Sequence, residues 1–288
     1  MTAGADALSQ LVEALFDERT AALAVRGPVL VVAAHADDET IGATWLMRRA
    51  PRLAVVHVTD GAPHDPRLWP ASAPPSREAY AALRRREAEA ALALVGVAPA
   101  RIHELGVADQ AAIEALVPIT RALAATLASV APALVVTHPY EGGHPDHDAT
   151  AFATRAALAL RAREGGLRAR LVEMSSYHRH DGTLRTGRFL PPVEGEQVRV
   201  LSDEERALKA QMFACYASQR AVLGDFRIDE ERYRAAAPAS FEAAPHQGSL
   251  HYEALGFAEG AHFRVQARAA IEALDLSARA LDEVTETR

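Results

Sequence analysis

The chain has 288 residues, of which 49% are hydrophobic and 24% are charged, and its formal net charge is −7. This composition is typical of a globular protein and excludes a disordered or membrane-embedded one. The net negative charge gives no general electrostatic reason to expect nucleic acid binding, which requires clustered Lys and Arg. Cys215 is the only cysteine, so internal disulfides and multi-cysteine metal sites are excluded.

The N-terminal segment and the apolar runs bear on where the protein works. The first 20 residues carry acidic residues early and lack the basic-then-apolar block of a signal peptide. No segment approaches the length that a bilayer span requires. We therefore expect a cytoplasmic protein without a membrane span.

Short apolar segments rich in valine predict the strands of a parallel sheet. The first runs from Pro28 to His35 and the second from Leu53 to Gly61. Further strands are expected near residue 102, over 133–139 and over 171–177. Continuous apolar runs of this length are typical of strands that are buried on both faces of a sheet.

Alanine-rich stretches with helical spacing separate these strands. They cover residues 77–95, 113–129 and 146–163, and a last helical run covers 258–284. Alternation of strand and helix predicts an α/β fold, with a doubly wound, mainly parallel sheet and helices on both of its faces.

Two segments depart from this alternation. Residues 61–76 are dense in proline and predict an ordered loop that could cover a site. Residues 225–256 lack a regular pattern because prolines and glycines interrupt it. Without an internal repeat or a shift in composition, the chain is expected to form one domain over 1–288, with an irregular C-terminal extension from about residue 225.

Clusters of potential ligands follow two of the predicted strands. The sequence HADDE, residues 35–39, comes directly after the first strand, and HPDH, residues 144–147, comes just after the fourth. In a doubly wound sheet with the strand order 3-2-1-4-5, the first and fourth strands are neighbours at the switch point, where ligands bind. The two motifs are therefore expected to meet in one crevice.

The residue types in these motifs indicate a metal site. A nucleotide site would need a glycine-rich turn after the first strand, whereas this turn is acidic and would repel phosphate. Two histidines and one carboxylate with an open position form a usual catalytic zinc site, and a spare carboxylate can serve as general base. Adjacent acids before a helix can also be N-terminal capping residues. Spacing alone does not decide which aspartate is a ligand.

The two motifs resemble a known family. AHADDE and HPDH are similar to the paired motifs of the PIG-L, or LmbE-like, deacetylases, whose usual first motif is AHPDDE. Thr59-Asp60-Gly61 and the pair Arg84-x-x-Glu87 support the resemblance, which covers most of the first 180 residues. It implies a Rossmann-like fold and hydrolysis of N-acetylglucosaminyl or related amides with a zinc ion.

The resemblance also implies a role for each motif residue. His35, Asp38 and His147 would be the metal ligands. Asp37 would be the general base, and His144 would stabilise the oxyanion and protonate the leaving amine, with Asp146 orienting His144.

Two positions depart from the family pattern, and four residues are candidate substrate contacts. Ala36 replaces the usual proline, and Gly142 stands where the branch that acts on mycothiol precursors has a tyrosine. A tyrosine donor must then come from elsewhere, and a mycothiol-type substrate is in doubt. The candidates for substrate contact are Arg84, Tyr140, Tyr177 and His178.

The resulting hypothesis is a zinc-dependent N-deacetylase of an amino sugar or a related glycoconjugate, with Fe²⁺ or another divalent metal as the alternative cofactor. An amidase of the same fold that acts on a non-sugar N-acyl amide is the first alternative. His35-x-Asp37 with His147 also matches the ligand triad of non-haem Fe(II) oxygenases. A module that binds sugar without turnover is a third. The expected partner is a small molecule, with neither nucleic acid nor membrane, and a homo-oligomer is compatible with the sequence.

Overall fold

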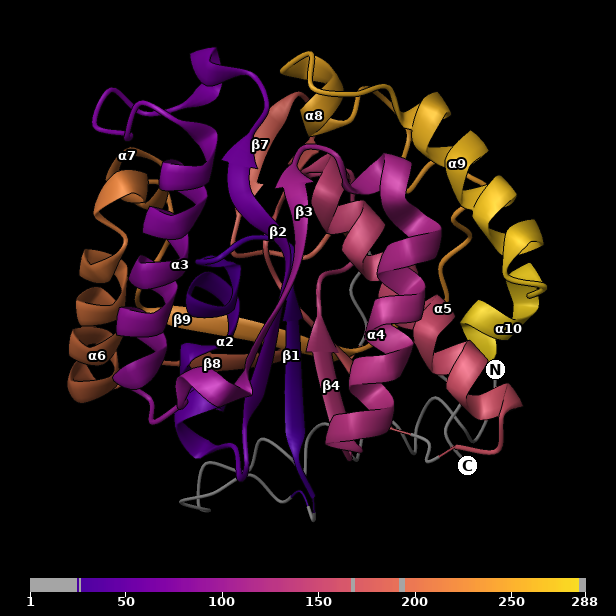
Figure 1. The fold of residues 1–288 in the computed structure, drawn as a ribbon, viewed down its shortest axis with the longest axis horizontal. Helices are drawn as coiled ribbons and strands as arrows, with labels where there is room; N and C mark the ends of the chain where they lie inside the picture. Colours follow the sequence, from indigo (N-terminus) through magenta and orange to yellow (C-terminus); the bar gives the residue numbers. More distant parts are fainter. Residues whose placement is uncertain (1–24, 26, 167–168, 192–194, 285–288) are drawn as a thin grey trace.

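The computed structural model describes residues 25, 27–166, 169–191 and 195–284, so the N-terminal segment considered above lies outside the described residues. Its centre is a seven-stranded sheet with the strand order β3-β2-β1-β4-β5-β9-β8 (Figure 1). The first five of these strands pair in parallel, as the sequence predicts. They are β1 (Val29–Ala33), β2 (Ala54–Pro63), β3 (Ile102–Asp109), β4 (Leu134–Thr137) and β5 (Arg170–Met174).

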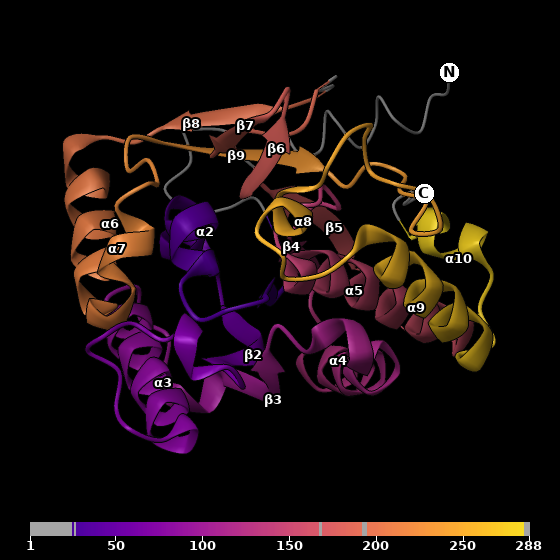
Figure 2. The same cartoon turned by 90° about the horizontal axis from the view of Figure 1, so that it is seen from above.

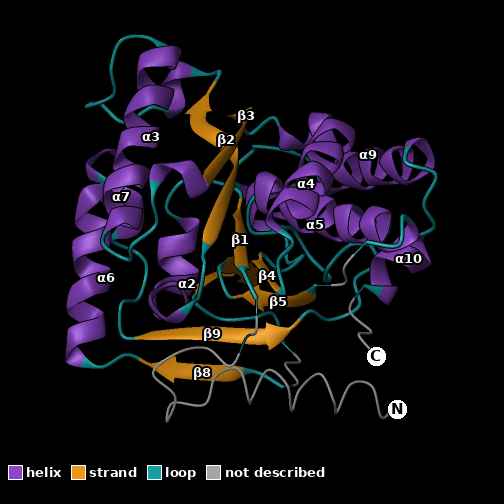
Figure 3. Ribbon diagram, turned by 60° about the horizontal axis from the view of Figure 1, so that its bottom comes forward, coloured by secondary structure: helices purple, strands orange, loops and turns teal. Residues whose placement is uncertain are grey.

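Helices cover both faces of the sheet, which confirms the predicted fold class (Figures 2 and 3). One layer consists of α2 (Asp38–Arg49), α3 (Arg77–Ala93), α6 (Asp203–Cys215) and α7 (Arg220–Leu223). The other consists of α4 (Leu116–Val130), α5 (Pro145–Arg163), α9 (Gly260–Ala273) and α10 (Ala278–Glu283). Short 3-10 turns connect them at Pro66–Leu68, Pro99–Arg101, Ala112–Ala115 and Ala217–Gln219.

The alternation of side chains along β1 divides the core between the two layers. Val29 and Val31 pack into the cluster under α2 and α6, whereas Leu30 and Val32 pack into the cluster under α4 and α5. All four side chains are buried. Successive side chains of a strand point to opposite faces, so a run of large apolar residues fills both layers at once.

The C-terminal third differs from the sequence prediction. Within residues 225–256, which were expected to be irregular, β9 (Glu230–Ala235) pairs antiparallel with β5. Strand β8 (Gln197–Val200), which precedes this stretch, pairs with β9 and extends the sheet. The prediction was wrong there because four of the six residues of β9 are charged, which hides its apolar alternation. A separate hairpin, β6 (Tyr177–His180) and β7 (Thr183–Thr186), and the short helix α8 (His251–Ala254) complete the described elements.

One helical stretch corrects the expectation about membrane spans. Ala112–Val130 is long and apolar enough to cross a bilayer by length and composition alone. In the fold it includes α4, which buries Ile119, Leu123 and Leu127 in the core cluster shared with α5. Its apolar residues therefore form the face by which a helix packs in the protein core.

Helix α2 is bent at Ala43, whose φ of −142° and ψ of 19° are not helical. In a regular helix the Ile41 carbonyl would accept from the Trp45 N–H. Here Lys209 Nζ donates to the Ile41 carbonyl at 2.6 Å, and Trp45 N–H donates to Glu231 Oε2 at 2.9 Å. Lys209 and Glu231 are fully buried and form an ion pair of 2.8 Å with each other. The pair thus satisfies both backbone groups at the bend.

This arrangement predicts a strong dependence of stability on Lys209. Lys209→Met leaves Glu231 buried without its cation, which should lower the free energy of unfolding by about 3–5 kcal/mol. Lys209→Met combined with Glu231→Gln removes the uncompensated charge and keeps an acceptor for Trp45, so it should be the more stable of the two variants. Chemical denaturation measures both. A double variant no more stable than Lys209→Met would contradict the ion-pair account.

Candidate active site

The turn between β1 and α2 brings Asp38 into the centre of a cluster of histidines. The Asp38 carboxylate accepts a hydrogen bond from the His35 backbone N–H at 2.8 Å. Its two oxygens lie 3.2 Å from His35 Nδ1 and 3.2 Å from His147 Nε2. Although burial opposes the shift, the His147 and His138 rings hold the pKa of Asp38 well below its ordinary value. Asp38 is therefore ionised and faces both predicted histidine ligands.

His147 enters this cluster from the first turn of α5. His144 is the N-cap of that helix and Pro145 its first residue, as the sequence predicts. His147 Nδ1 lies 3.3 Å from Ser176 Oγ, while its buried Nε2 has no hydrogen-bond partner among the described residues. Burial lowers the pKa of His147 to about 4, so the ring is neutral. If Nδ1–H donates to Ser176 Oγ, Nε2 carries the lone pair that a metal ligand needs. An unpartnered buried nitrogen beside a carboxylate suits a metal ligand.

Carboxylates lie beside both ring nitrogens of His35. Opposite the Asp38 side, its Nε2 lies 3.3 Å from Asp109 and 3.2 Å from Asp146. Although burial opposes it, the Asp109 charge raises the pKa of His35 well above its ordinary value. The position thus attracts a cation. With Nδ1 facing Asp38, Nε2–H would donate to these two carboxylates, the usual second contact of a metal-binding histidine.

The donor set therefore fits a divalent cation held by His35, Asp38 and His147. Three overlapping groups have ligand atoms within 4.8 Å of one another, and the three predicted ligands are divided between them. The groups are His35 with His144 and His147, Asp38 with His138 and His147, and His35 with Asp109, His144 and Asp146. Two histidines and one carboxylate match the ligands of catalytic zinc sites.

His138 was missed by sequence reasoning. It follows β4, and its ring stacks on His147 with the centroids 4.1 Å apart. Its Nε2 accepts a hydrogen bond from the Ala34 N–H at 3.0 Å, so that nitrogen supports the turn and is already engaged. The signal was present in the sequence, because His138 lies at the carboxyl end of a predicted strand.

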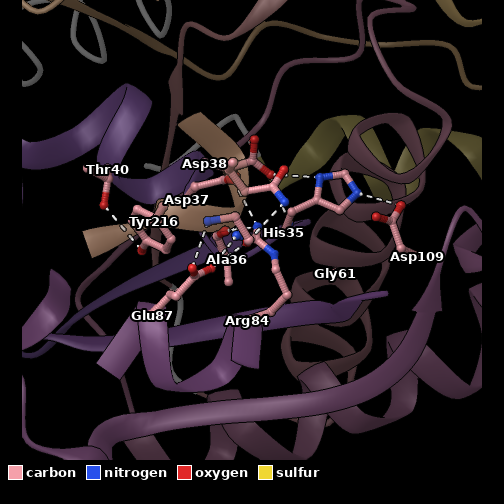
Figure 4. Close-up of polar contacts among 12 residues, drawn as sticks. His35, Ala36, Asp37, Asp38, Thr40, Gly61, Arg84, Glu87, Asp109 and Tyr216 are labelled. Carbon is pink, nitrogen blue, oxygen red and sulfur yellow. Dashed lines mark hydrogen bonds and ion pairs between the residues drawn. The ribbon is translucent and has the colours of Figure 1, made fainter. Parts of the chain in front are cut away.

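The Asp37 carboxylate is held by a buried arginine (Figure 4). Arg84 Nη2 donates to Asp37 Oδ2 at 2.9 Å and also to the Ala36 carbonyl. Asp37 has a φ of 135°, a conformation that non-glycine residues rarely adopt. Burial raises the pKa of the Asp37 carboxyl to about 7, against the opposing charge of Arg84.

Asp146 has a different partner from the one expected. Its carboxylate accepts the backbone N–H groups of Gln110 and Ala112 at 2.6 and 3.1 Å and also contacts His35. The nearest oxygen lies 3.9 Å from His144 Nδ1, beyond hydrogen-bond distance. The prediction that the Asp146 carboxylate orients His144 was therefore wrong. Instead the Asp146 backbone N–H donates to His144 Nδ1 at 3.2 Å.

Two of the four predicted substrate contacts line the site. Tyr177 and Arg84 border a cavity of about 580 Å³ above the motif residues, whereas Tyr140 and His178 do not. The Tyr140 hydroxyl donates to the Ala243 carbonyl at 2.9 Å in the core near α9, and burial raises its pKa above the ordinary value. His178 is buried beside Glu141. The prediction that Tyr140 and His178 contact the substrate directly is therefore corrected.

The cavity also contains residues that the sequence analysis did not select. Asp109, the last residue of β3, lies on its floor with His35, Asp37, Asp38, His144 and His147. The proline-rich loop borders the cavity through Pro63, Leu68, Trp69 and Pro70. The cavity lies beyond the carboxyl ends of β1 and β4, where the doubly wound fold places its ligands.

Comparison with known proteins agrees with this geometry. Residues 30–158, which contain both motifs, match the family model of the GlcNAc-PI de-N-acetylase, PIG-L. Over this segment the chain is similar to that family. No protein of curated function matches the chain.

Solved structures share the fold of this segment and its surroundings. A deacetylase of teicoplanin biosynthesis is 17% identical over 72% of this chain and 96% of its own, with a TM-score of 0.53. An antimicrobial pseudoaglycone deacetylase is 22% identical over 73% and 97%, with a TM-score of 0.52. A 4-carboxy-2-hydroxymuconate hydratase from Pseudomonas putida is 15% identical over 73% and 95%, with a TM-score of 0.51. At sequence identities this low, the similarity to these structures shows a shared fold alone.

The geometry predicts different metal contents for variants of the two adjacent aspartates. Asp38→Ala removes the only carboxylate from the three-ligand set, so zinc affinity should fall by at least roughly tenfold. Asp37→Asn leaves the ligand set intact and should retain wild-type zinc content. Metal analysis after dialysis against graded zinc measures both. If Asp37→Asn were metal-free and Asp38→Ala still loaded, the ligand assignment would be reversed.

Proposed function

We propose that the protein is a metal-dependent deacetylase that hydrolyses the N-acetyl group of an amino sugar or a related glycoconjugate. The observation that carries this proposal is the convergence of a three-ligand donor set with a separate buried carboxylate, Asp37, on the floor of one cavity. The PIG-L domain match supports the same reaction class.

A divalent cation held by His35, Asp38 and His147 would polarise the amide carbonyl and lower the pKa of the attacking water. The chain's own residues supply the proton transfers. Asp37 accepts the proton of the attacking water, because a general base works best with a pKa near the working pH and that of Asp37 is raised to about 7. Arg84 fixes the direction of the Asp37 carboxylate.

His144 supplies a hydrogen-bond donor to the oxyanion. Its Nδ1 accepts the Asp146 backbone N–H, so a neutral ring carries its proton on Nε2. Burial lowers the pKa of His144 to about 3, and the ring is therefore neutral near pH 7. This favours oxyanion stabilisation over the second role that the resemblance implies, protonation of the amine. Asp37, having accepted a proton, then returns it to the leaving amine.

A second reaction class needs consideration because the fold also occurs in a hydratase. A shared fold does not determine the reaction, so the site must decide. Both reactions activate water, but only amide hydrolysis needs a proton returned to a departing amine. The raised pKa of the Asp37 carboxyl, about 7, supports the proposal that Asp37 carries that proton. The Fe(II) oxygenase alternative requires oxygen, which the proposed reaction does not use.

A substrate screen tests the proposal directly. The metal-loaded protein should release acetate and free amine in equal amounts from at least one N-acetylated amino sugar or glycoconjugate in anaerobic buffer. Chelation should abolish this activity and added zinc should restore it. Full activity in metal-free protein would exclude the proposed mechanism, and oxygen-dependent turnover would favour the oxygenase.

Asp37→Asn tests the assignment of the base. The substitution keeps the shape of the side chain and removes the proton acceptor, so kcat should fall by roughly 10²–10⁴-fold. Added zinc should not restore it. Steady-state kinetics at saturating substrate, with the zinc content of the same sample, measures the effect. A kcat near wild type would mean that another group takes the proton.

Arg84→Lys separates a positioning role from a substrate contact. Arg84 Nη2 donates to the Ala36 carbonyl and the Asp37 carboxylate, while Nη1 donates to Glu87 Oε2 at 3.4 Å. A single lysine ammonium cannot reproduce this spread of donors. Loss of one charged hydrogen bond should lower kcat by roughly 10–100-fold with little change in KM. A raised KM with unchanged kcat would instead show that Arg84 binds the substrate.

A further inference from the structure

A histidine interrupts the apolar core of β2. From Ala54 to Val58 every residue of this strand is apolar except His57, which is only 2% exposed. Val55, two residues earlier, belongs to the core cluster under α2 and α6, so His57 points to the same face of the sheet. A buried polar group in such a run needs a hydrogen-bond partner. The partner of His57 lies in the first turn of α2.

That partner is Glu39, whose carboxylate has no exposed surface. Its Oε1 accepts the Tyr216 hydroxyl at 2.6 Å and the Thr40 hydroxyl at 3.0 Å. Its Oε2 accepts the Asp37 backbone N–H at 3.1 Å and lies 3.2 Å from His57 Nε2. Groups that donate thus lie at both oxygens, which suits a carboxylate that only accepts. His57 Nε2 therefore carries the proton in this contact.

The arrangement of the donors explains why a carboxylate and a histidine meet here. Each oxygen of Glu39 has two partners, and those of Oε2 are the Asp37 N–H and the His57 ring. An amide at Glu39 would turn its NH₂ group toward one of these pairs of donors. An apolar residue at His57 would leave Oε2 with the backbone N–H alone. His57 therefore fixes the oxygen to which the Asp37 N–H is bound.

The backbone group held in this way belongs to the residue with the least usual conformation of the site. Asp37 has a φ of 135°, and a conformation of this kind persists only where the surrounding contacts enforce it. Arg84 Nη2 binds the Asp37 carboxylate at 2.9 Å, whereas Glu39 binds its backbone. The rotamers open to a side chain depend on the backbone dihedrals, so the backbone contact also bears on the direction of the carboxylate.

Building on the proposed function, we propose that His57 is a positioning residue for the base Asp37. It fixes the Glu39 carboxylate, which holds the Asp37 backbone in the conformation that presents its carboxylate to the attacking water. His57 does not line the substrate cavity, so its effect on the reaction is indirect. Its Nδ1 has no hydrogen-bond partner among the described residues, and the side chain lines a separate cavity of about 210 Å³ that Ala36 also lines.

Substitutions of His57 that differ in their ability to donate to Glu39 test the inference. The amide nitrogen of a glutamine reaches the position of a histidine Nε2, so His57→Gln can keep the hydrogen bond and His57→Leu cannot. In the zinc-loaded protein His57→Leu should lower kcat by roughly 10–100-fold, with KM and zinc content near wild type. His57→Gln should keep kcat within roughly threefold of wild type. A merely structural role would lower stability without this selective loss of kcat.

The Asp37 amide proton reports the same contact without turnover. An N–H that donates to a carboxylate resonates downfield of a free amide, and the resonance moves upfield as the hydrogen bond weakens. In zinc-loaded protein that carries ¹⁵N-labelled aspartate, this resonance should move upfield in His57→Leu and stay near its wild-type position in His57→Gln. His57→Asn is a second disrupting variant that should behave as His57→Leu, because its amide reaches the position of Nδ1 instead of Nε2.

His178 provides the matched control. It is another buried histidine beside a buried glutamate, with Nδ1 3.4 Å from Glu141 Oε2, and it does not line the substrate cavity. His178→Leu should leave the Asp37 amide resonance at its wild-type position. A shift as large as that in His57→Leu would show that the resonance reports a general loosening of the core, which would overturn the inference.

The two readouts separate this inference from the proposed function. An unmoved Asp37 amide or an unchanged kcat in His57→Leu and His57→Asn would overturn the positioning role even if amides are hydrolysed. A shifted amide in a protein that hydrolyses no N-acetylated sugar would support the contact from His57 to the Asp37 backbone and overturn the deacetylase function.

Discussion

The clamp of Arg84 on the turn at Asp37 is the interaction on which the site depends. A non-glycine residue in this backbone conformation costs about 1–3 kcal/mol, which the surroundings must offset. Arg84 binds the Ala36 carbonyl and the Asp37 carboxylate, and the Asp37 N–H donates to Glu39 Oε2 at 3.1 Å. Because the chain turns here, adjacent carboxylates face different environments: the pKa of Asp37 is raised and that of Asp38 is lowered. Carboxyl groups with opposite shifts can take different roles in one reaction.

The turn is supported by residues outside the PIG-L segment 30–158. Glu39 is fully buried and accepts a hydrogen bond from the Tyr216 hydroxyl at 2.6 Å, and Glu87 beside Arg84 accepts from Ser218 Oγ at 2.6 Å. The Lys209–Glu231 pair satisfies the bend of α2, the helix that follows the turn. The geometry of the turn with the motif residues thus depends on contacts from residues 209–231. Helix α6 and strand β9 are therefore part of the structural unit that supports the candidate site.

The sequence predicted the parts of the molecule that depend on local pattern. Valine-rich runs predicted the parallel strands, and the usual strand order of a doubly wound sheet, which the structure confirms, placed the motifs after β1 and β4 in one crevice. What it could not predict depends on side-chain direction and long-range pairing. Tyr177 and His178 are adjacent on β6, so they point to opposite faces and only Tyr177 lines the cavity. The contact between Asp146 and His35 depends on how the connection between β3 and α4 folds. The spacing of residues in the sequence does not reveal this.

The motif residues and most of the apolar residues that line the cavity come from different parts of the chain. The motif residues that line it lie within the segment 30–158, whereas several of its apolar lining residues come from β7, the α7 region and the segment after α8, all beyond residue 158: Leu184, Val222, Phe226, Leu255 and Phe257. Loops and short elements at the edge of a rigid sheet can change without disturbing the ligands and the base, so a conserved reaction can serve different substrates. Apolar side chains in the lining lower the local dielectric constant, so they would strengthen the hydrogen bond proposed from His144 to a developing negative charge.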